Sequence, residues 1–170
     1  METSDIYNLC DLLLAELNKF DRTIIHLGKL ITDNRLKLLE QSIGFDLPLD
    51  FKYILTNYNG ISLIGTEVYG IDDSLKEESL DKIYHYEHNN VANKLPGQYF
   101  PFSPDGQGNH YCLDLSKLQN MLCPVIFWQH DFNYSSLAEV EICNENFMHW
   151  TQEVLIDWTL EDTNYDGTDK

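Results

Sequence analysis

The residues of this chain that most resemble a functional site lie in one short stretch, SPDGQGNHYCLDL (residues 103–115). Two glycines, two carboxylates, two side-chain amides and a histidine gather there around one turn, so we consider calcium and phosphate binding first. A calcium loop alternates several oxygen ligands, and only Asp105 and Asn109 approach that spacing. A phosphate loop needs either a Gly-Lys-Ser/Thr ending or a third glycine before a helix, and neither is present. Turn chemistry explains the stretch better, because Asp105-Gly106 is a strong hairpin signal.

Histidine ligation of a metal ion is the second chemistry that the sequence allows. His85 and His88 stand three apart in HYEH, which would place both on one helical face. Zinc proteases instead use H-E-x-x-H, with the glutamate between the ligands. Histidines in a polar segment are usually surface residues, so we expect no metal and no cofactor. A three-ligand site that adds His110 or His130 remains an alternative.

Nucleophilic catalysis and general acid catalysis have no clear signature in the chain. There is no G-x-S-x-G motif, and the carboxylate pairs Asp72-Asp73 and Glu77-Glu78 lie in a polar segment without apolar shielding that would raise a pKa. The cysteines are widely spread and form no C-x-x-C pair, so we expect buried, reduced thiols. They are Cys10, Cys112, Cys123 and Cys143. We therefore predict that the protein is not an enzyme.

The charge of the chain narrows the class of partner. With 28 acidic and 11 basic residues the formal charge is -17, which argues against nucleic acid as a direct partner. Residues 118–170 contain ten acids, and their only base is Lys170. Such a field attracts a basic protein, although it also serves solubility. No apolar run reaches the roughly 20 residues of a membrane span, and the N-terminus is acidic, so we expect a cytoplasmic protein without membrane contact.

Aromatic residues gather on the segments that we expect to be strands. Most should be buried against helices, and any that point outward beside acids would anchor a basic protein partner. They are Tyr69, Tyr99, Phe100, Phe102, Tyr111, Phe127, Trp128 and Tyr134.

The elements that must position these residues follow an α+β order. Helical spacing of apolar residues predicts three helices within the first 60 residues, at about residues 4–20, 33–43 and 49–58. A β-branched and aromatic pattern then predicts one or two strands at 61–71, a hairpin at 98–115, and strands at 123–131 and 138–142. A short helix at 79–89 and a closing helix at 144–158 complete the pattern. We expect one domain at 1–158 with a helical N-terminal extension at 1–31, followed by an acidic tail at 159–170 that has nothing to bury.

This order of motifs resembles the SUKH superfamily, which includes bacterial toxin-immunity proteins and a fungal regulator of cell-wall glucan synthesis. LEQSIGFDLPLDFKYILTNYNGI (Leu39–Ile61) is similar to the family's helix, Leu-Pro, helix and Asn-Gly pattern. FPFSPDGQGNHYCLDL (Phe100–Leu115) resembles its hairpin. EVYGI at 67–71, CPVIFWQHD at 123–131 and NENFMHWTQEVL at 144–155 follow in the family's order. Two positions depart from the pattern: Ile61 stands where a second glycine is common, and Asn109 where a carboxylate is.

The resemblance implies a binding protein without catalysis, built on N-terminal helices, a central and mainly antiparallel mixed sheet of about six strands, and a closing C-terminal helix. It also implies that the protein captures and neutralises a cognate toxin domain, for which a nuclease with a basic surface is one candidate. A regulatory or scaffold module in cell-wall synthesis or signalling is the alternative. We expect the contact surface to include Glu67, Tyr69, Asp105, Gln107, Asn109, Trp128, His130 and Asp131.

Overall fold

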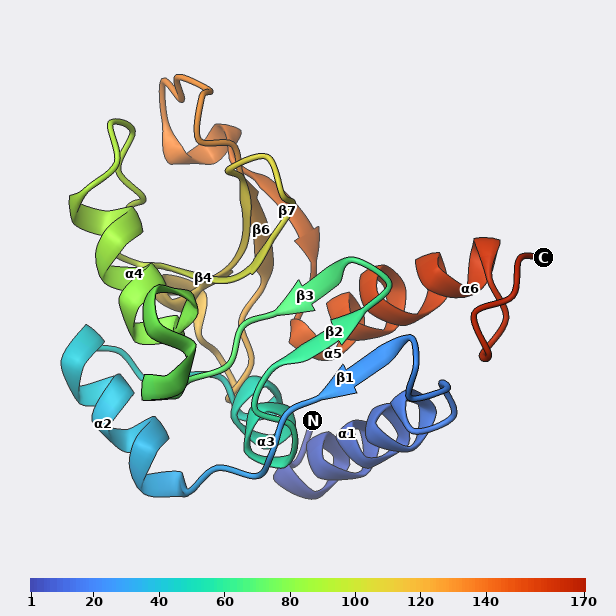
Figure 1. The fold of residues 1–170 in the computed structure, drawn as a ribbon. Helices are drawn as coiled ribbons and strands as arrows, with labels where there is room; N and C mark the ends of the chain where they lie inside the picture. Colours follow the sequence, from blue (N-terminus) through green and yellow to red (C-terminus); the bar gives the residue numbers. More distant parts are fainter.

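Helices fill most of the first 57 residues of the computed structural model, which describes residues 1–170 (Figure 1). Their apolar residues recur at helical spacing and face the core, as the sequence predicted. The second helix ends at Gly44, whose φ of 76° is a left-handed cap conformation that suits glycine. The third begins directly after Pro48, whose fixed φ suits a helix start. These helices are α1 (Thr3–Leu17), α2 (Asp33–Ile43) and α3 (Leu49–Asn57).

The first sheet is small and antiparallel, with the strand order β1-β2-β3. The strands are β1 (Ile25–Leu27), β2 (Ile61–Leu63) and β3 (Thr66–Val68). The predicted strand region at 61–71 thus forms a hairpin, which turns at Gly65. β1 lies in a segment that we expected to be a break between helices. Its three residues are too few for their alternation to be recognised as a strand pattern, and pairing with the distant β2 defines it as a strand.

The second sheet is an antiparallel meander in the order β4-β5-β6-β7. Its strands are β4 (Tyr99–Pro104), β5 (His110–Asp114), β6 (Val125–Trp128) and β7 (Glu141–Asn144). The two sheets meet where the Tyr69 N–H donates a hydrogen bond of 2.9 Å to the Phe102 carbonyl. All strand pairings are antiparallel, and the strands form two sheets where we expected one. The α+β class is confirmed.

Short helical segments connect and close the sheets. Between the sheets lie η1 (Asp73–Glu78) and α4 (Leu80–Asn89), and within the second sheet lie η2 (Leu115–Lys117) and η3 (Leu137–Glu139). The predicted closing helix is present as one continuous helical run, whose middle part has π-type hydrogen bonding. It consists of α5 (Phe147–Trp150), η4 (Thr151–Asp157) and α6 (Trp158–Asp162). None of the helices combines the length and apolar character needed to cross a membrane.

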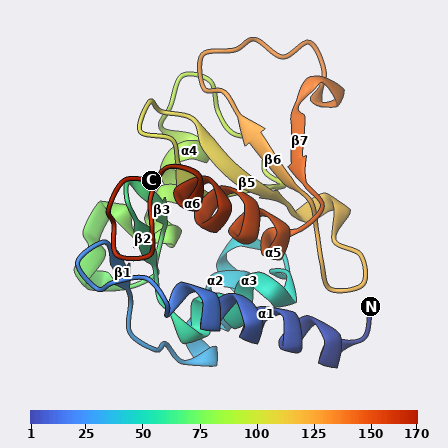
Figure 2. The same ribbon diagram turned by 90° about the vertical axis from the view of Figure 1, so that its right-hand side faces the viewer.

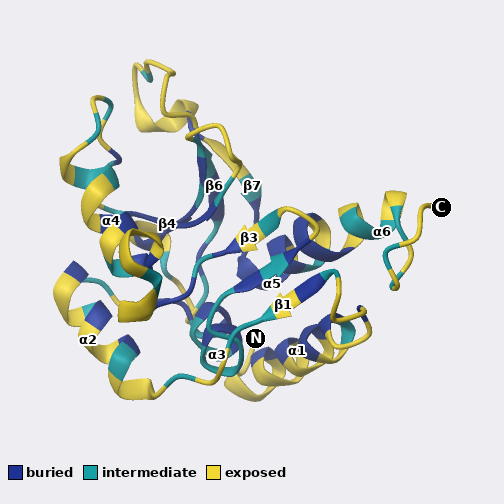
Figure 3. Ribbon diagram, viewed as in Figure 1, coloured by how far each residue is buried: buried dark blue, intermediate teal, exposed yellow.

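An aromatic cluster holds the helices against the second sheet. The rings of Phe51 from α3 and Phe147 from α5 lie edge to face, with centroids 4.9 Å apart. Phe102 from β4 meets the Trp150 ring at 4.8 Å, also edge to face. Edge-to-face pairs add to the stabilisation that burial gives. Buried residues therefore concentrate where the closing helix, α1, α3 and the sheets meet (Figure 3).

The C-terminal tail is packed against the domain, contrary to the expectation that it has nothing to bury. The Tyr165 ring packs at a tilt against Phe20 with ring centroids 4.9 Å apart, and the Tyr165 carbonyl accepts the Asp21 N–H at 2.8 Å. Its hydroxyl also donates a hydrogen bond to Glu16 of α1. A single aromatic residue in a polar, acidic segment therefore fastens the tail to the end of the first helix.

Candidate functional site

The turn between β4 and β5 is organised by the side chain of Asp105. Its Oδ1 accepts the backbone N–H groups of Gln107 at 2.8 Å and Asn109 at 3.0 Å, and its Oδ2 accepts the Asn109 amide at 2.6 Å. Burial pushes the pKa of Asp105 upward, but these hydrogen bonds outweigh it and hold the pKa below its usual value. The predicted hairpin therefore presents an ionised carboxylate at neutral pH.

Asn109 connects this turn to the end of β6. Its side-chain oxygen accepts the His130 N–H at 3.0 Å and lies 2.9 Å from His130 Nδ1. Gly108, with a φ of 95°, lies so close that an added Cβ would be 3.0 Å from the imidazole ring. The structure thus brings together three residues that the sequence proposed for one surface, Asp105, Asn109 and His130. The contact also explains why glycine occupies position 108.

Tyr69 lies half-buried beside this turn, in a strongly acidic environment. Burial raises the pKa of its hydroxyl well above the usual value, and the carboxylates of Glu67, Glu78, Glu87 and Asp105 raise it further. These acids come from β3, η1, α4 and the β4–β5 turn, four segments that are separate in the sequence. We call these five residues the Tyr69 acidic surface. Glu78 and Glu87 were not among the predicted site residues, since no local pattern shows that distant segments converge.

His110 lies beneath the acidic surface without neutralising it. Its ring centroid is 6.2 Å from that of Tyr69, and the side chain is buried. Burial lowers the pKa of His110 to about 4, against the upward effect of Asp105 and with a further lowering by His130. The imidazole is therefore neutral at neutral pH. Burial likewise raises the pKa of the neighbouring Cys112 thiol well above its usual value, so this thiol is not activated as a nucleophile.

The remaining predicted contact residues lie in different environments. Trp128 is only 4% exposed and stacks on Tyr134 with centroids 4.6 Å apart, so its ring lies within the domain. Gln107 is exposed at the tip of the turn, and Asp131 is exposed beyond β6. Burial of Trp128 follows from its place on β6, where it points into a small second cluster with Tyr99 and Ile126.

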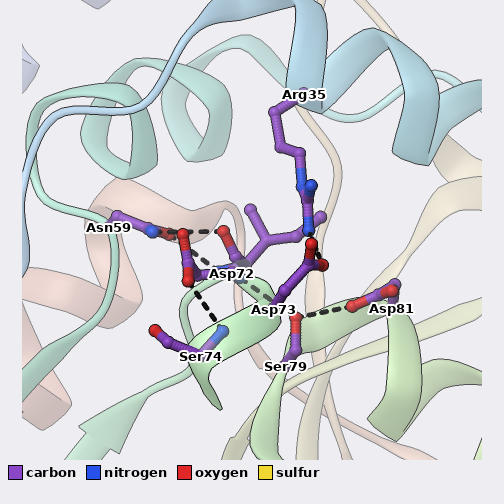
Figure 4. A network of polar contacts seen from close by, with 8 residues as sticks. Arg35, Asn59, Asp72, Asp73, Ser74, Ser79 and Asp81 are labelled. Carbon is purple, nitrogen blue, oxygen red and sulfur yellow. Dashed lines mark hydrogen bonds and ion pairs between the residues drawn. The ribbon is translucent and has the colours of Figure 1, made fainter. Parts of the chain in front are cut away.

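A polar network holds the segment that carries Glu78 and Glu87 (Figure 4). Arg35 of α2 forms an ion pair of 2.6 Å with Asp73, at the start of η1. Ser79 accepts the Asp72 N–H at 3.1 Å and donates to Asp81 at 2.5 Å, which links η1 to the first turn of α4. The network thereby fixes the direction in which η1 and α4 leave the first sheet.

Asn59 supplies the other end of this network. Its Oδ1 accepts the Ile71 N–H at 2.7 Å, and its Nδ2 donates to the Ile71 carbonyl at 3.1 Å, so the amide pairs with the backbone after β3 (Figure 4). An added Cβ at Gly70 would lie 2.7 Å from the Asn59 carbonyl oxygen, and one at Gly28 would lie 1.9 Å from it. The Asn-Gly motif at the end of α3 therefore acts as a structural corner.

The histidines considered as metal ligands are occupied by other contacts or lie apart. The His88 ring nitrogens are 2.6 Å from the Tyr84 carbonyl and 3.1 Å from the Pro96 carbonyl, and the ring packs on Tyr84. His85 is exposed on α4, and no group of three His, Cys, Asp or Glu residues is arranged to hold a metal ion. The histidine-metal alternative has no support in this geometry.

Comparison with known families specifies the class of protein to which this fold belongs. A model of the SUKH_5 family, described as SMI1-KNR4 cell-wall, matches residues 11–156. The chain therefore belongs to the SUKH_5 family within the SUKH superfamily, as the order of its motifs indicated. That superfamily includes toxin-immunity proteins and SMI1-KNR4 regulators.

Proposed function

We propose that the protein is an immunity protein, which binds and neutralises a cognate toxin domain of a bacterial polymorphic toxin system. The observation that carries the proposal is the Tyr69 acidic surface, where four segments contribute carboxylates around one aromatic side chain. An aromatic anchor within a field of one sign suits a partner with the opposite charge. The partner is then a basic protein, such as a nuclease domain whose surface normally binds phosphates.

Neutralisation by this surface requires no chemical reaction. Carboxylates of the immunity protein occupy the basic side chains that the toxin uses for its substrate, and the bound domain excludes that substrate. Charge complementarity of this kind raises the association rate and makes it dependent on salt. The buried, protonated thiol of Cys112 and the neutral His110 support a role in binding without catalysis. Four free cysteines suit the reducing cytoplasm, where we place the protein.

The experiment is a capture of the partner with the full-length protein, at low and at high salt. We expect one basic protein to be recovered at low salt and its recovery to fall as salt increases. Reversing two exposed charges of the surface, Glu67→Lys with Glu78→Lys, should abolish capture. The matched control Asp46→Lys with Glu161→Lys changes the net charge equally at exposed sites elsewhere and should retain the partner. Equal loss in both double variants, or capture that salt does not affect, would contradict the proposal.

The description of the matching family favours one second function, a regulatory or scaffold module in cell-wall synthesis or signalling. The two functions differ in what the captured partner does. A partner that kills or arrests cells unless this protein is co-expressed identifies an immunity protein. A partner that belongs to the cell's own wall synthesis or signalling machinery, with no toxicity when expressed alone, identifies the regulator.

A further inference from the structure

A groove runs between the second sheet and the closing helical segment, apart from the elements that hold the four carboxylates of the Tyr69 acidic surface. It encloses about 340 Å³, which lies within the range of sites that hold a small ligand or one large side chain. Three aromatic residues and three polar ones define it, from β5, β6, β7, η4 and α6. They are Tyr111, Phe127, Glu141, Asn144, Glu153 and Trp158.

Strand register explains why this part of the sheet is open. Tyr111 pairs with Phe127 across β5 and β6, and Phe127 pairs with Glu141 across β6 and β7, so all three side chains share one face. The closing helical segment passes along β5–β7 (Figure 2), and Trp150 packs on Tyr111 with ring centroids 5.4 Å apart. The helix covers one side of Tyr111. The rest of the row, Phe127 and Glu141, is left uncovered and forms the floor of the groove together with the other side of Tyr111.

Asn144 holds one carboxylate in position in the wall of this groove. The residue is 7% exposed, and its Nδ2 donates to the Glu153 carboxylate at 2.6 Å. Both residues line the groove. A carboxylate accepts several hydrogen bonds at its two oxygens, so this one leaves Glu153 with acceptor capacity for a ligand that donates.

The other residues that line the groove favour a cation as the ligand that donates hydrogen bonds. Glu141 and Glu153 place two carboxylates at its edge, and no lysine or arginine is among the residues that line it. Tyr111 and Phe127, with ring centroids 5.0 Å apart, and the half-exposed Trp158 present aromatic surface to the same space. Aromatic faces attract cations, most strongly where water is excluded.

We infer that this groove binds the guanidinium group of an arginine side chain of the protein partner. A guanidinium is planar and weakly hydrated, it stacks on aromatic faces, and it carries five donors in a fixed fork. Its donors reach the Glu141 and Glu153 carboxylates, while the plane of the group rests on the aromatic floor. The compact, strongly hydrated ammonium of lysine matches this combination less well. The inference rests on the proposed binding of a basic partner and specifies one residue of that partner.

The test uses a blocked amino acid in place of the partner, so that it does not depend on finding the partner. Nα-acetyl-arginine amide is titrated into the full-length protein, and NMR follows the side-chain amide of Asn144 and the indole N–H of Trp158. We expect both signals to shift with a Kd on the order of 1 mM, as ordinary ligand efficiency gives for about 15 heavy atoms. The citrulline analogue, which is neutral and nearly the same shape, should not bind. The lysine analogue should bind at least about threefold more weakly.

Two variants locate the binding. Glu153→Gln should weaken binding of the arginine probe at least about fivefold, whereas Glu161→Gln, the same change at an exposed site outside the groove, should leave it within about twofold. Asn144→Leu removes the amide that holds the Glu153 carboxylate and should weaken binding at least about threefold, and Glu153→Gln keeps the test valid if that buried substitution unfolds the domain. No shift up to 50 mM probe (about 50 times the expected Kd), equal binding of citrulline, or equal effects of Glu153→Gln and Glu161→Gln would overturn the inference.

Failure of this inference and failure of the proposed function give different results. If the probe binds as described but no basic partner is captured, the groove is an arginine site and the proposed function is wrong. If a basic partner is captured and Glu153→Gln leaves its affinity unchanged, the proposed function holds and the groove is not the place where arginine binds.

Discussion

The buried carboxylate of Asp50, in the first turn of α3, accepts the backbone N–H of Met148, in the first turn of α5, at 3.1 Å. Its other oxygen accepts the Phe51 N–H at 2.8 Å. One side chain therefore satisfies free backbone N–H groups at the starts of two helices that are 98 residues apart. Helix N-termini favour negative charge, so the arrangement is electrostatically consistent although the carboxylate is fully buried.

Removing this carboxylate should destabilise the protein strongly. Asp50→Ala leaves two buried N–H groups without an acceptor, and we expect the free energy of unfolding to fall by about 2–4 kcal/mol. Urea denaturation followed by tryptophan fluorescence measures the change. Asp33→Ala is the matched control, because Asp33 also lies in the first turn of a helix but is exposed and makes no hydrogen bond. The control should change stability by less than about 0.5 kcal/mol. Equal losses in the two variants would show that the Asp50 contacts are unimportant.

Two buried groups should give opposite dependences of stability on pH. Burial raises the pKa of Asp50 from 3.8 to about 6, so between these values the folded state holds the proton more tightly and stability falls as the pH rises. Burial lowers the pKa of His110 from 6.5 to about 4, so in nearly the same window stability increases with pH. At 1.36 kcal/mol per pKa unit each effect amounts to about 3 kcal/mol, and the two nearly cancel.

Single variants should separate these two effects. Relative to the wild type, Asp50→Asn should gain stability as the pH rises from 4 to 6.5, because it lacks the group that opposes His110. His110→Leu should lose stability relative to the wild type over the same range. Urea denaturation at half-unit pH steps measures both differences, and all other titrating groups cancel in the comparison. Two profiles parallel to that of the wild type would show that neither group has a shifted pKa.

The sequence specified the helices and the meander well, because each carries local signals. Gly44 and Pro48 mark the boundary between α2 and α3, and Asp105-Gly106 marks the hairpin. Features that depend on distant partners carried no such signal. β1 is a strand only because β2 lies beside it, Asp50 is a cap only because α5 begins next to it, and Tyr165 is partly buried only because Phe20 is near.

Gly28 lies at a tight corner of the fold, where there is no room for a larger side chain. An added Cβ would lie 1.9 Å from the Asn59 carbonyl oxygen, a distance that only backbone movement can relieve. Gly28→Ala should therefore lower the free energy of unfolding by at least about 2 kcal/mol. Gly97→Ala is the control, since no atom lies within 4 Å of its added Cβ, and it should be neutral or slightly stabilising. Thermal denaturation of both variants tests the contrast, and similar melting temperatures would contradict it.

Alanine variants of the β4–β5 turn distinguish side chains that hold the turn together from side chains that contact the partner. Replacing Asp105, Gln107 and Asn109 together by alanine removes three hydrogen bonds within the turn and those to His130. We expect faster amide hydrogen exchange at residues 105–110 and 128–132, with the core strands unchanged. Gln107→Ala alone removes an exposed side chain that makes no hydrogen bond, so it should affect partner binding without affecting exchange. Unfolding of the whole domain by the triple change would show that the turn is structural throughout.

The candidate surface was only partly predictable from sequence, because some of its residues come from segments that are far apart along the chain. Asp105 and Asn109 lie in the β4–β5 turn and His130 lies just after β6, at the same end of one meander, so their meeting follows from the hairpin pattern. Glu78 and Glu87 come from η1 and α4, a segment held by contacts with residues distant in the sequence, such as the Asn59 amide and Arg35. Trp128 was expected among the contacts, but strand alternation turns its ring inward.

Cys143 also lines the groove that we propose to bind arginine, so its thiol reports the electrostatics there independently of any ligand. Burial, together with the smaller effects of the Glu141 and Glu153 carboxylates, raises the pKa of its thiol to about 11. It is the only one of the four cysteines that is not fully buried, so alkylation of the native protein should occur there first. We expect iodoacetamide at pH 8 to react with it at least about tenfold more slowly than with an unstructured cysteine peptide, because thiolate is the reactive form.

Charge variants of the two neighbouring acids complete this prediction. Glu141→Gln with Glu153→Gln should accelerate alkylation of Cys143 by lowering its pKa, whereas Glu139→Gln with Glu161→Gln removes the same charge elsewhere and should not. Peptide mapping by mass spectrometry gives the rate at each cysteine. A thiol that reacted at the rate of the free peptide would show that the groove lacks the negative potential on which cation binding depends. If alkylation is faster only in the Glu141→Gln, Glu153→Gln variant, the negative potential of the groove comes from the two carboxylates proposed to bind the guanidinium.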